Sequence, residues 1–263
     1  MKVLLVNGSP KANGNTARAL AKVAEQLNAE GIDTEVFQLG AKPIRDCIGC
    51  GQCGKLDCRC TFDDDVVNEL IAAAEQADGF VFGSPVYYAH PSGRILSALD
   101  RAFYAGSKAF AHKPGAAVAV ARRGGTSTTF DVLNKYFTIN QMPVVASTYW
   151  NNVFGAMPGE AAQDAEGLAT MRNIGKNMAW ILRCIEAGKA AGIEAPPSRS
   201  RQDQLYPIVQ RRAPRCFDNV SEKPTDEARC LERGERWAFA RVRRLKGRLP
   251  VRWLRSVEVT VVR

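Results

Sequence analysis

Short apolar runs alternate with longer amphipathic stretches through the first three quarters of the chain. Apolar runs bounded by turn residues predict strands at residues 2–6, 34–39, 79–82, 115–121 and 143–148. Apolar residues at helical spacing predict helices at about 16–30, 63–77, 92–104, 128–137 and 160–188, the second of them capped by acidic residues 63–65. Strands that alternate with helices form a parallel sheet with helices on both faces, so we predict a doubly wound α/β domain.

The loop after the first strand has the composition of an anion-binding turn. Ligands of doubly wound sheets bind at the carboxyl ends of the strands. Residues 7–16, NGSPKANGNT, lead from such an end into a helix. The backbone N–H groups there, with the side chains of Ser9, Asn15 and Thr16, can hold a phosphate dianion. The loop has neither the Walker ending nor the Gly-x-Gly-x-x-Gly pattern, and a plain turn capped by Thr16 stays open as the alternative.

Two further loops follow the third and fourth predicted strands. In residues 83–93, Tyr87 and Tyr88 offer flat apolar surfaces beside backbone polar groups, which suits a planar heteroaromatic ligand. Packing of both rings between loop and sheet is the alternative. Residues 122–126, RRGGT, combine arginines that can stabilise an anionic ligand with glycines that permit close approach, although a solvated turn fits equally. All three loops are predicted at one edge, so one ligand with a phosphate end and a flat end explains them together.

Five of the eight cysteines fall within 14 residues: Cys47, Cys50, Cys53, Cys58 and Cys60. In a chain with no sign of export, such a cluster indicates metal or redox chemistry rather than a disulfide framework. A [4Fe–4S] cluster needs four cysteines, and Cys47, Cys50, Cys53 and Cys58 begin with the spacing common in ferredoxins. A structural zinc and the absence of any metal stay open, and Cys60 could replace Cys58 as the last ligand.

The charge of the chain divides it into two parts. Residues 1–195 carry 19 basic and 19 acidic side chains, whereas residues 196–263 carry 17 basic and 8 acidic ones and supply the whole net charge of +9. We therefore predict a domain over residues 1–195 and an irregular basic tail over residues 196–263. The tail could be out-of-frame or read-through sequence, a disordered extension, or a basic tether to a membrane or nucleic acid.

The apolar run at the start of the chain is too short for a signal peptide, and no run is long enough to span a membrane. We therefore expect a cytoplasmic protein without a membrane partner. The neutral body also gives no reason to expect a nucleic-acid partner.

Residues 7–10 with 14–16, and residues 83–87, resemble the NAD(P)H-dependent FMN reductases of the flavodoxin superfamily. The motif CIGCGQC, residues 47–53, is similar to the branch that includes iron–sulfur flavoproteins. The resemblance covers about residues 1–193. It implies a flavodoxin-like, three-layer, doubly wound sheet of five parallel strands, and usually a homodimer or homotetramer.

The resemblance also implies a bound FMN. Its phosphate would lie at Ser9, Asn15 and Thr16, with Lys11 and Asn13 of the same loop also among the cofactor-binding residues. Its ring would lie against the segment Pro85, Val86, Tyr87 and Tyr88 and against Gly124 and Gly125. The compact fourth cysteine of the family motif would place the cluster ligands at Cys47, Cys50, Cys53 and Cys58.

These expectations predict an FMN-dependent oxidoreductase that takes a hydride from NAD(P)H and reduces a quinone, a nitro compound or a flavin. The candidates for stabilising the negative charge of the reduced ring are Tyr87, Tyr88, Arg122 and Arg123. One alternative is an electron-transfer protein that carries FMN and a [4Fe–4S] cluster and serves a redox partner. Another is a non-catalytic module that binds flavin or nucleic acid.

Overall fold

The apolar runs lie side by side in one sheet, in a computed structural model that describes residues 1–197. The strands are β1 (Lys2–Asn7), β2 (Asp33–Gln38), β3 (Gly79–Tyr87), β4 (His90–Pro91), β5 (Gly115–Ala121) and β6 (Asn152–Phe154). Five of them are parallel in the order β2-β1-β3-β5-β6, and β4 pairs antiparallel with the end of β3. The predicted tail, residues 196–263, lies outside the described residues except for its first two prolines.

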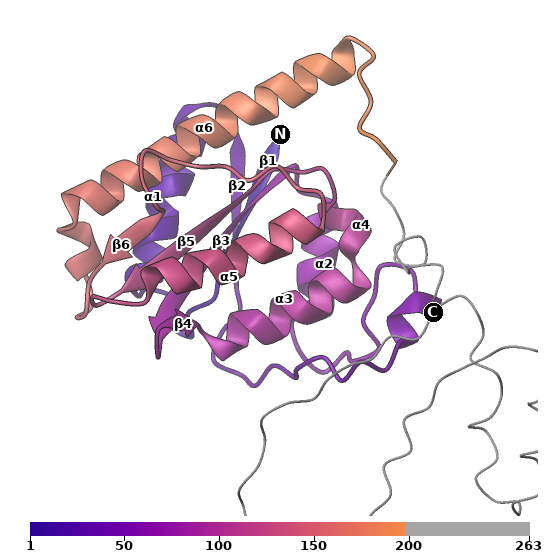
Figure 1. Ribbon diagram of the computed structural model, residues 1–263, viewed down its shortest axis with the longest axis horizontal. Coiled ribbons are helices and arrows are strands. Elements are labelled where there is room, and N and C mark those ends of the chain that lie inside the picture. The colour runs from indigo at the N-terminus through magenta and orange to yellow at the C-terminus, as the bar shows by residue number, and fades with distance from the viewer. Residues whose placement is uncertain (198–263) are drawn as a thin grey trace, which may run out of the picture. The chain divides into compact units, whose positions relative to one another are not determined.

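Helices cover both faces of this sheet (Figure 1). They are α1 (Asn15–Ala29), α2 (Val67–Glu75), α3 (Gly93–Ala105), α4 (Ser107–Phe110), α5 (Thr126–Ile139) and α6 (Ala165–Ala190), with short 3-10 turns η1 (Gln52–Lys55) and η2 (Glu160–Ala162). One face packs against α1 and α6, and the other against α2, α3, α4 and α5. The predicted three-layer, doubly wound architecture is therefore confirmed. Within residues 1–197, no helix has the length and apolar character needed to cross a membrane.

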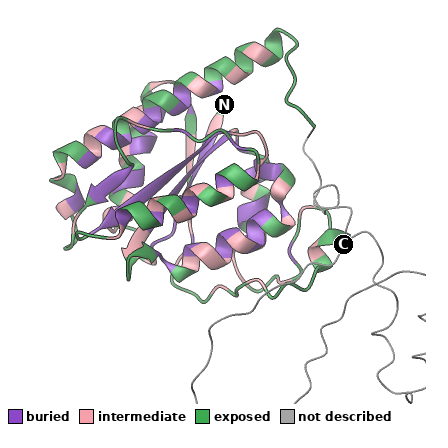
Figure 2. Cartoon of the chain, viewed as in Figure 1, coloured by how far each residue is buried: buried purple, intermediate pink, exposed green. Residues whose placement is uncertain are grey.

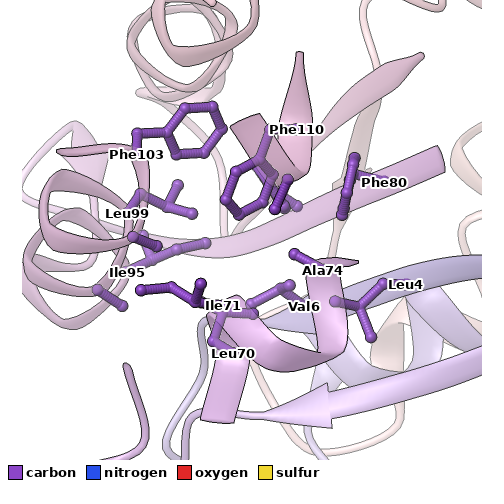
Figure 3. Packing of buried hydrophobic residues seen from close by; sticks show 14 of the residues in the cluster. Leu4, Val6, Leu70, Ile71, Ala74, Phe80, Ile95, Leu99, Phe103 and Phe110 are labelled. Atoms are coloured by element: carbon purple, nitrogen blue, oxygen red, sulfur yellow. The ribbon is translucent and has the colours of Figure 1, made fainter. Parts of the chain in front are cut away.

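The central strands are apolar on both faces because both faces are covered. Successive side chains of a strand point to opposite faces of the sheet, so each strand contributes to two cores. Leu4, Val6 and Phe80 pack with α2, α3 and α4, as Figure 3 shows, whereas Leu5 and Val81 pack with α1 and α6. Figure 2 shows the resulting buried layer between exposed helix faces. This rigid sheet fixes where the loops at its carboxyl edge lie.

The prediction of a fifth strand at residues 143–148 is wrong. This segment makes a single bridge to β5, between Val144 and Gly115, and the fifth parallel strand is β6. The physical reason is a loop that leaves the sheet between these two points. The side-chain amide of Asn151 donates to the carbonyl of Ala117 at 2.9 Å, and so takes the position that a strand N–H would have. The pairing with β5 resumes only from Asn152.

Candidate functional site

The loops after β1 and β3 are joined by direct hydrogen bonds. The N–H of Gly8 donates to the carbonyl of Gly83 at 2.8 Å, and the hydroxyl of Ser92 donates to the carbonyl of Gly8 at 2.9 Å. A Cβ at Gly8 would come within 2.8 Å of the Gly83 oxygen. Only glycine therefore permits this approach of the two loops.

The loop after β5 packs against the hairpin formed by β3 and β4. The two residues in the turn of this hairpin, Tyr88 and Ala89, have positive φ angles of 49° and 62°, which costs energy for residues with a Cβ. Gly125 has a φ of +89°, and a Cβ there would lie 2.5 Å from the Cα of Ala89. The structure thus brings all three predicted loops together at the carboxyl edge of the sheet.

We predict that Gly125→Ala destabilises the flavin-free protein by about 2 kcal/mol, because the new Cβ meets backbone and the φ is unfavourable. The melting temperature should fall by roughly 5 °C. Gly124→Ala is the matched control, since a Cβ at Gly124 meets nothing within 4 Å. Equal melting temperatures for the two variants would mean that the loop after β5 does not pack on the hairpin.

Two helices begin at this edge without a side-chain cap. The N-cap residues of α1 and α5 are Gly14 and Gly125, and neither helix has an acidic residue in its first turn. In contrast, Ser92 accepts from the N–H of Ile95 at the start of α3, and Asp164 accepts from that of Gly167 at the start of α6. The uncapped N–H groups and the helix dipole favour an anion at the start of α1 and of α5.

The predicted phosphate-loop residues lie around the start of α1, with one exception described below. Ser9 is buried, and its hydroxyl accepts from the N–H of Lys11 at 3.2 Å. The side chain of Lys11 lies over the N-cap, since its Cβ is 3.2 Å from where a Cβ on Gly14 would be. Thr16 is buried in the first turn, and Asn13 is exposed at the tip of the loop. A basic side chain therefore lies beside uncapped N–H groups.

Asn15 lies at the start of α1, but its side chain is turned toward the segment after β6. Its amide nitrogen donates to the carbonyl of Met157 at 3.0 Å, and its amide oxygen accepts from the N–H of Ala161 at 3.3 Å. The side chain thus ties α1 to this segment. Its predicted contact with a phosphate stays a prediction, and it would require these bonds to break.

An open groove of about 740 Å³ lies between the loop after β5 and the segment after β6, a volume typical of small-molecule sites. Its lining residues are Arg122, Arg123, Phe154, Gly155, Ala156, Met157, Glu160 and Gln163. The Glu160 carboxylate accepts from the N–H groups of Met157 and Ala156, at 2.9 and 2.6 Å. These two bonds, followed by the charge of Arg122, lower the pKa of Glu160.

The four predicted charge-stabilising residues do not share this groove. Arg122 and Arg123 line it and are exposed. Tyr87 and Tyr88 are absent from its lining and lie on the β3–β4 hairpin, where Tyr88 is 99% exposed. The tyrosines therefore do not pack between loop and sheet. Pro85 and Val86 are half-buried beneath them, and Val86 faces Gly125.

The cysteine loop encloses a second, smaller hollow of about 100 Å³. Four cysteines are among its lining residues, Cys47, Cys50, Cys53 and Cys60. Four soft thiolate donors with no histidine or carboxylate among them suit an iron–sulfur cluster or zinc. Within residues 1–197 no three potential ligands are already arranged around one point to hold a metal ion. The donor set therefore fits a four-cysteine site, although the loop must close for ligation.

Cys58, the fourth ligand predicted from the family motif, lies elsewhere. It packs against the core between the sheet and α2, and it is not part of the lining of the hollow. Burial raises the pKa of its thiol, and the carboxylate of Glu75 adds to this shift. The thiolate form that a metal needs is thus disfavoured at this position.

Sequence reasoning missed Arg101 of α3, which also lines this hollow. Arg101 is 1% exposed, and its Nε donates to the Sγ of Cys60 at 3.3 Å. It forms a buried ion pair with Asp65. The acidic run was predicted to cap a helix, and Asp65 does accept from the N–H of Val67 at 3.1 Å, but its other oxygen faces Arg101. The only signal in the sequence was an arginine beside the apolar positions of α3.

Comparisons with known proteins agree on one family. Residues 1–156 match the family model described as NADPH-dependent FMN reductase. The chain is 35% identical over 195 residues to an iron-sulfur flavoprotein of Methanocaldococcus jannaschii, covering 71% of this chain and 100% of that protein. It is 31% identical over 134 residues to an NADPH azoreductase of a Bacillus species, covering 51% of this chain and 65% of that protein.

A solved structure supports the fold. A flavodoxin, WrbA-like protein from Agrobacterium tumefaciens matches with a TM-score of 0.50 and 18% identity, covering 70% of this chain and 97% of that one. The predicted flavodoxin-like fold is therefore confirmed, with six strands in place of five because of β4.

Proposed function

Because the chain belongs to the NADPH-dependent FMN reductase family, we propose that it passes electrons from NAD(P)H through FMN to a quinone, a nitro compound or a flavin. The general class, an NAD(P)H-dependent FMN oxidoreductase, is that of the family. The acceptor is our proposal. The observation that carries the assignment is the meeting of three loops at the one edge where α1 and α5 begin without caps.

Bound FMN supplies hydride acceptance and electron release, and the protein supplies binding, orientation and electrostatics. The start of α1 would hold the phosphate, with Ser9 and Thr16 donating hydroxyls and Lys11 adding positive charge. The hairpin with Tyr88 at its tip and the open surface at Gly124 would face the ring. The uncapped start of α1 with Lys11 beside it supports the phosphate end of this proposal, and the exposed hairpin beside the loop after β5 supports the ring end.

The acceptor is tested by steady-state NADPH and NADH oxidation by the FMN-loaded protein. We expect turnover with at least one of a benzoquinone, a nitroaromatic compound and free riboflavin, and none after the flavin is removed. Turnover that does not depend on flavin would contradict the mechanism. A flavin-loaded protein that oxidises neither nucleotide with any of the three would refute the proposed activity.

We predict that replacing Arg122 and Arg123 together by alanine lowers the midpoint potential of the FMN and slows turnover about tenfold. Positive charge near the ring favours the anionic reduced form of the flavin. The loss of turnover should be smaller than the loss caused by removing a buried donor, because both arginine side chains are exposed. Lys135→Ala with Lys176→Ala is the control, since both are exposed residues of α5 and α6. An unchanged potential and turnover would exclude both arginines from this role.

A second candidate function is electron transfer through FMN and a [4Fe–4S] cluster to a redox partner. The observation that favours it is the hollow with four cysteines among its lining residues. We propose Cys47, Cys50, Cys53 and Cys60 as the ligands, in place of the set with Cys58. Anaerobic reconstitution with iron and sulfide, followed by iron, sulfide and zinc analysis, tests it. Four iron and four sulfide per chain is the expected result, and bound zinc or no metal would refute it.

A further inference from the structure

The cysteine loop contacts the buried guanidinium of Arg101. The guanidinium of Arg101 makes contacts on every side: Nε donates to the Sγ of Cys60 at 3.3 Å, one terminal nitrogen pairs with Asp65, and the other donates to the carbonyl of Phe62 at 3.1 Å. Its carbon also lies 5.4 Å from the centre of the Phe62 ring. An arginine so enclosed cannot turn away, so its charge is fixed beside the hollow.

Cys60 is held at its backbone as well as at its sulfur. Its N–H donates to the side-chain oxygen of Asn68 at 2.8 Å, and its carbonyl accepts from the amide nitrogen of the same residue at 3.1 Å. Asn68 belongs to α2, whereas Arg101 belongs to α3. Two helices thus fix this cysteine, whereas Cys50 is exposed on the loop and Cys47 and Cys53 are half-buried there.

We propose that Arg101 is a positioning residue for the fourth cluster ligand: it orients the sulfur of Cys60 toward the hollow and offsets the negative charge of the four-thiolate cluster. The inference rests on the second candidate function. Hydrogen bonds to cluster sulfurs and nearby charge are among the factors that set the reduction potential of an iron–sulfur cluster. Because reduction adds an electron to an already negative group, a fixed cation favours the reduced form.

Asp65 opposes part of this effect. Its side chain is 4% exposed and pairs with a terminal nitrogen of the guanidinium, whereas Cys60 accepts from Nε. In a buried site such a carboxylate is weakly screened, so it reduces the field that Arg101 exerts on the hollow. The two side chains should therefore shift the cluster potential in opposite directions when each is made neutral, which a purely structural role of the pair does not predict.

The test compares Arg101→Gln, Arg101→Lys and Asp65→Asn in the full chain, reconstituted anaerobically with ferrous iron and sulfide. Potentials are measured by redox titration with electron paramagnetic resonance. We expect a more negative cluster potential in Arg101→Gln, a smaller shift in Arg101→Lys, and a more positive potential in Asp65→Asn. Arg94→Gln is the control, because Arg94 lies on the same helix but bonds to the carbonyls of Ala41 and Lys42.

Flavin content and NADPH oxidation of the same samples report the proposed reductase function separately. If Arg101→Gln loses its iron but keeps its flavin, positioning is supported. If Arg101→Gln fails to fold, the inference is tested by the cluster potentials of Arg101→Lys and Asp65→Asn, which should shift in opposite directions. The inference would be overturned by unchanged cluster potentials, by shifts in the same direction for the Arg101 and Asp65 variants, or by a wild-type protein that takes up no iron. In each of these cases the flavin content and NADPH oxidation would still test the reductase assignment separately.

Discussion

Replacing Cys60 by serine is expected to remove most of the iron from the reconstituted protein, whereas replacing Cys58 by serine is expected to leave the iron in place. The reason is that Cys60 lines the hollow with three other cysteines and is fixed by Arg101, whereas Cys58 packs against the core. The two substitutions are chemically identical and only two residues apart, so each is the control for the other. Iron and sulfide per chain, together with the broad visible absorbance of the cluster, measure the outcome.

The iron content of the two variants also separates the competing ligand sets. If Cys58→Ser loses its iron and Cys60→Ser retains it, the ligand set predicted from the family motif is correct. The loop must then rearrange when the cluster binds. Flavin content should be equal in both variants, because no residue that lines the hollow belongs to the three loops that follow β1, β3 and β5.

Lys11→Glu is expected to weaken FMN binding about tenfold or more at low ionic strength. The side chain of Lys11 lies over Gly14, the uncapped start of α1, so the change places a negative charge where the phosphate dianion is expected. Lys11 is solvent-exposed and Gly14 is half-buried, so the difference in affinity should shrink as salt screens the charges. Dissociation constants from flavin fluorescence quenching measure the effect.

Lys135→Glu is the matched control for this charge reversal. Lys135 is exposed on α5, about three turns from the start of that helix, and carries the same charge change without facing the predicted phosphate site. Equal affinities of the two variants for FMN would show that the phosphate does not lie at the start of α1.

The layers of the fold follow from the sequence because each strand and each helix carries its own periodicity. Residues 115–121 are predicted and observed as a strand, since an unbroken apolar run fits burial on both faces. Residues 143–148 are also mostly apolar, but they do not form the predicted strand. Their pairing with β5 depends on Asn151, whose side chain bonds to Ala117 across a separation of 34 residues. Local patterns do not reveal such a contact.

Part of the candidate site could be predicted from local patterns in the sequence, and part of it could not. The three loops at the sheet edge were predictable, because the carboxyl ends of parallel strands meet and each loop carried glycine at the points of close approach. The ion pair of Arg101 with Asp65 and the bond of Asn15 to Met157 join residues 36 and 142 positions apart. Each of these residues had a sufficient local explanation, as a helix position, a cap or a loop residue, so the sequence alone did not connect them.

Whether this edge of the sheet binds FMN through its phosphate is decided by calorimetric titration of the flavin-stripped chain with FMN. We expect saturable binding of one FMN per chain, with a dissociation constant of about 1 μM or below, which corresponds to roughly −8 kcal/mol. Riboflavin, which lacks the phosphate, should bind more weakly by at least about tenfold. A folded protein that takes up no FMN at these concentrations, or that binds riboflavin equally well, would contradict the phosphate site at the start of α1.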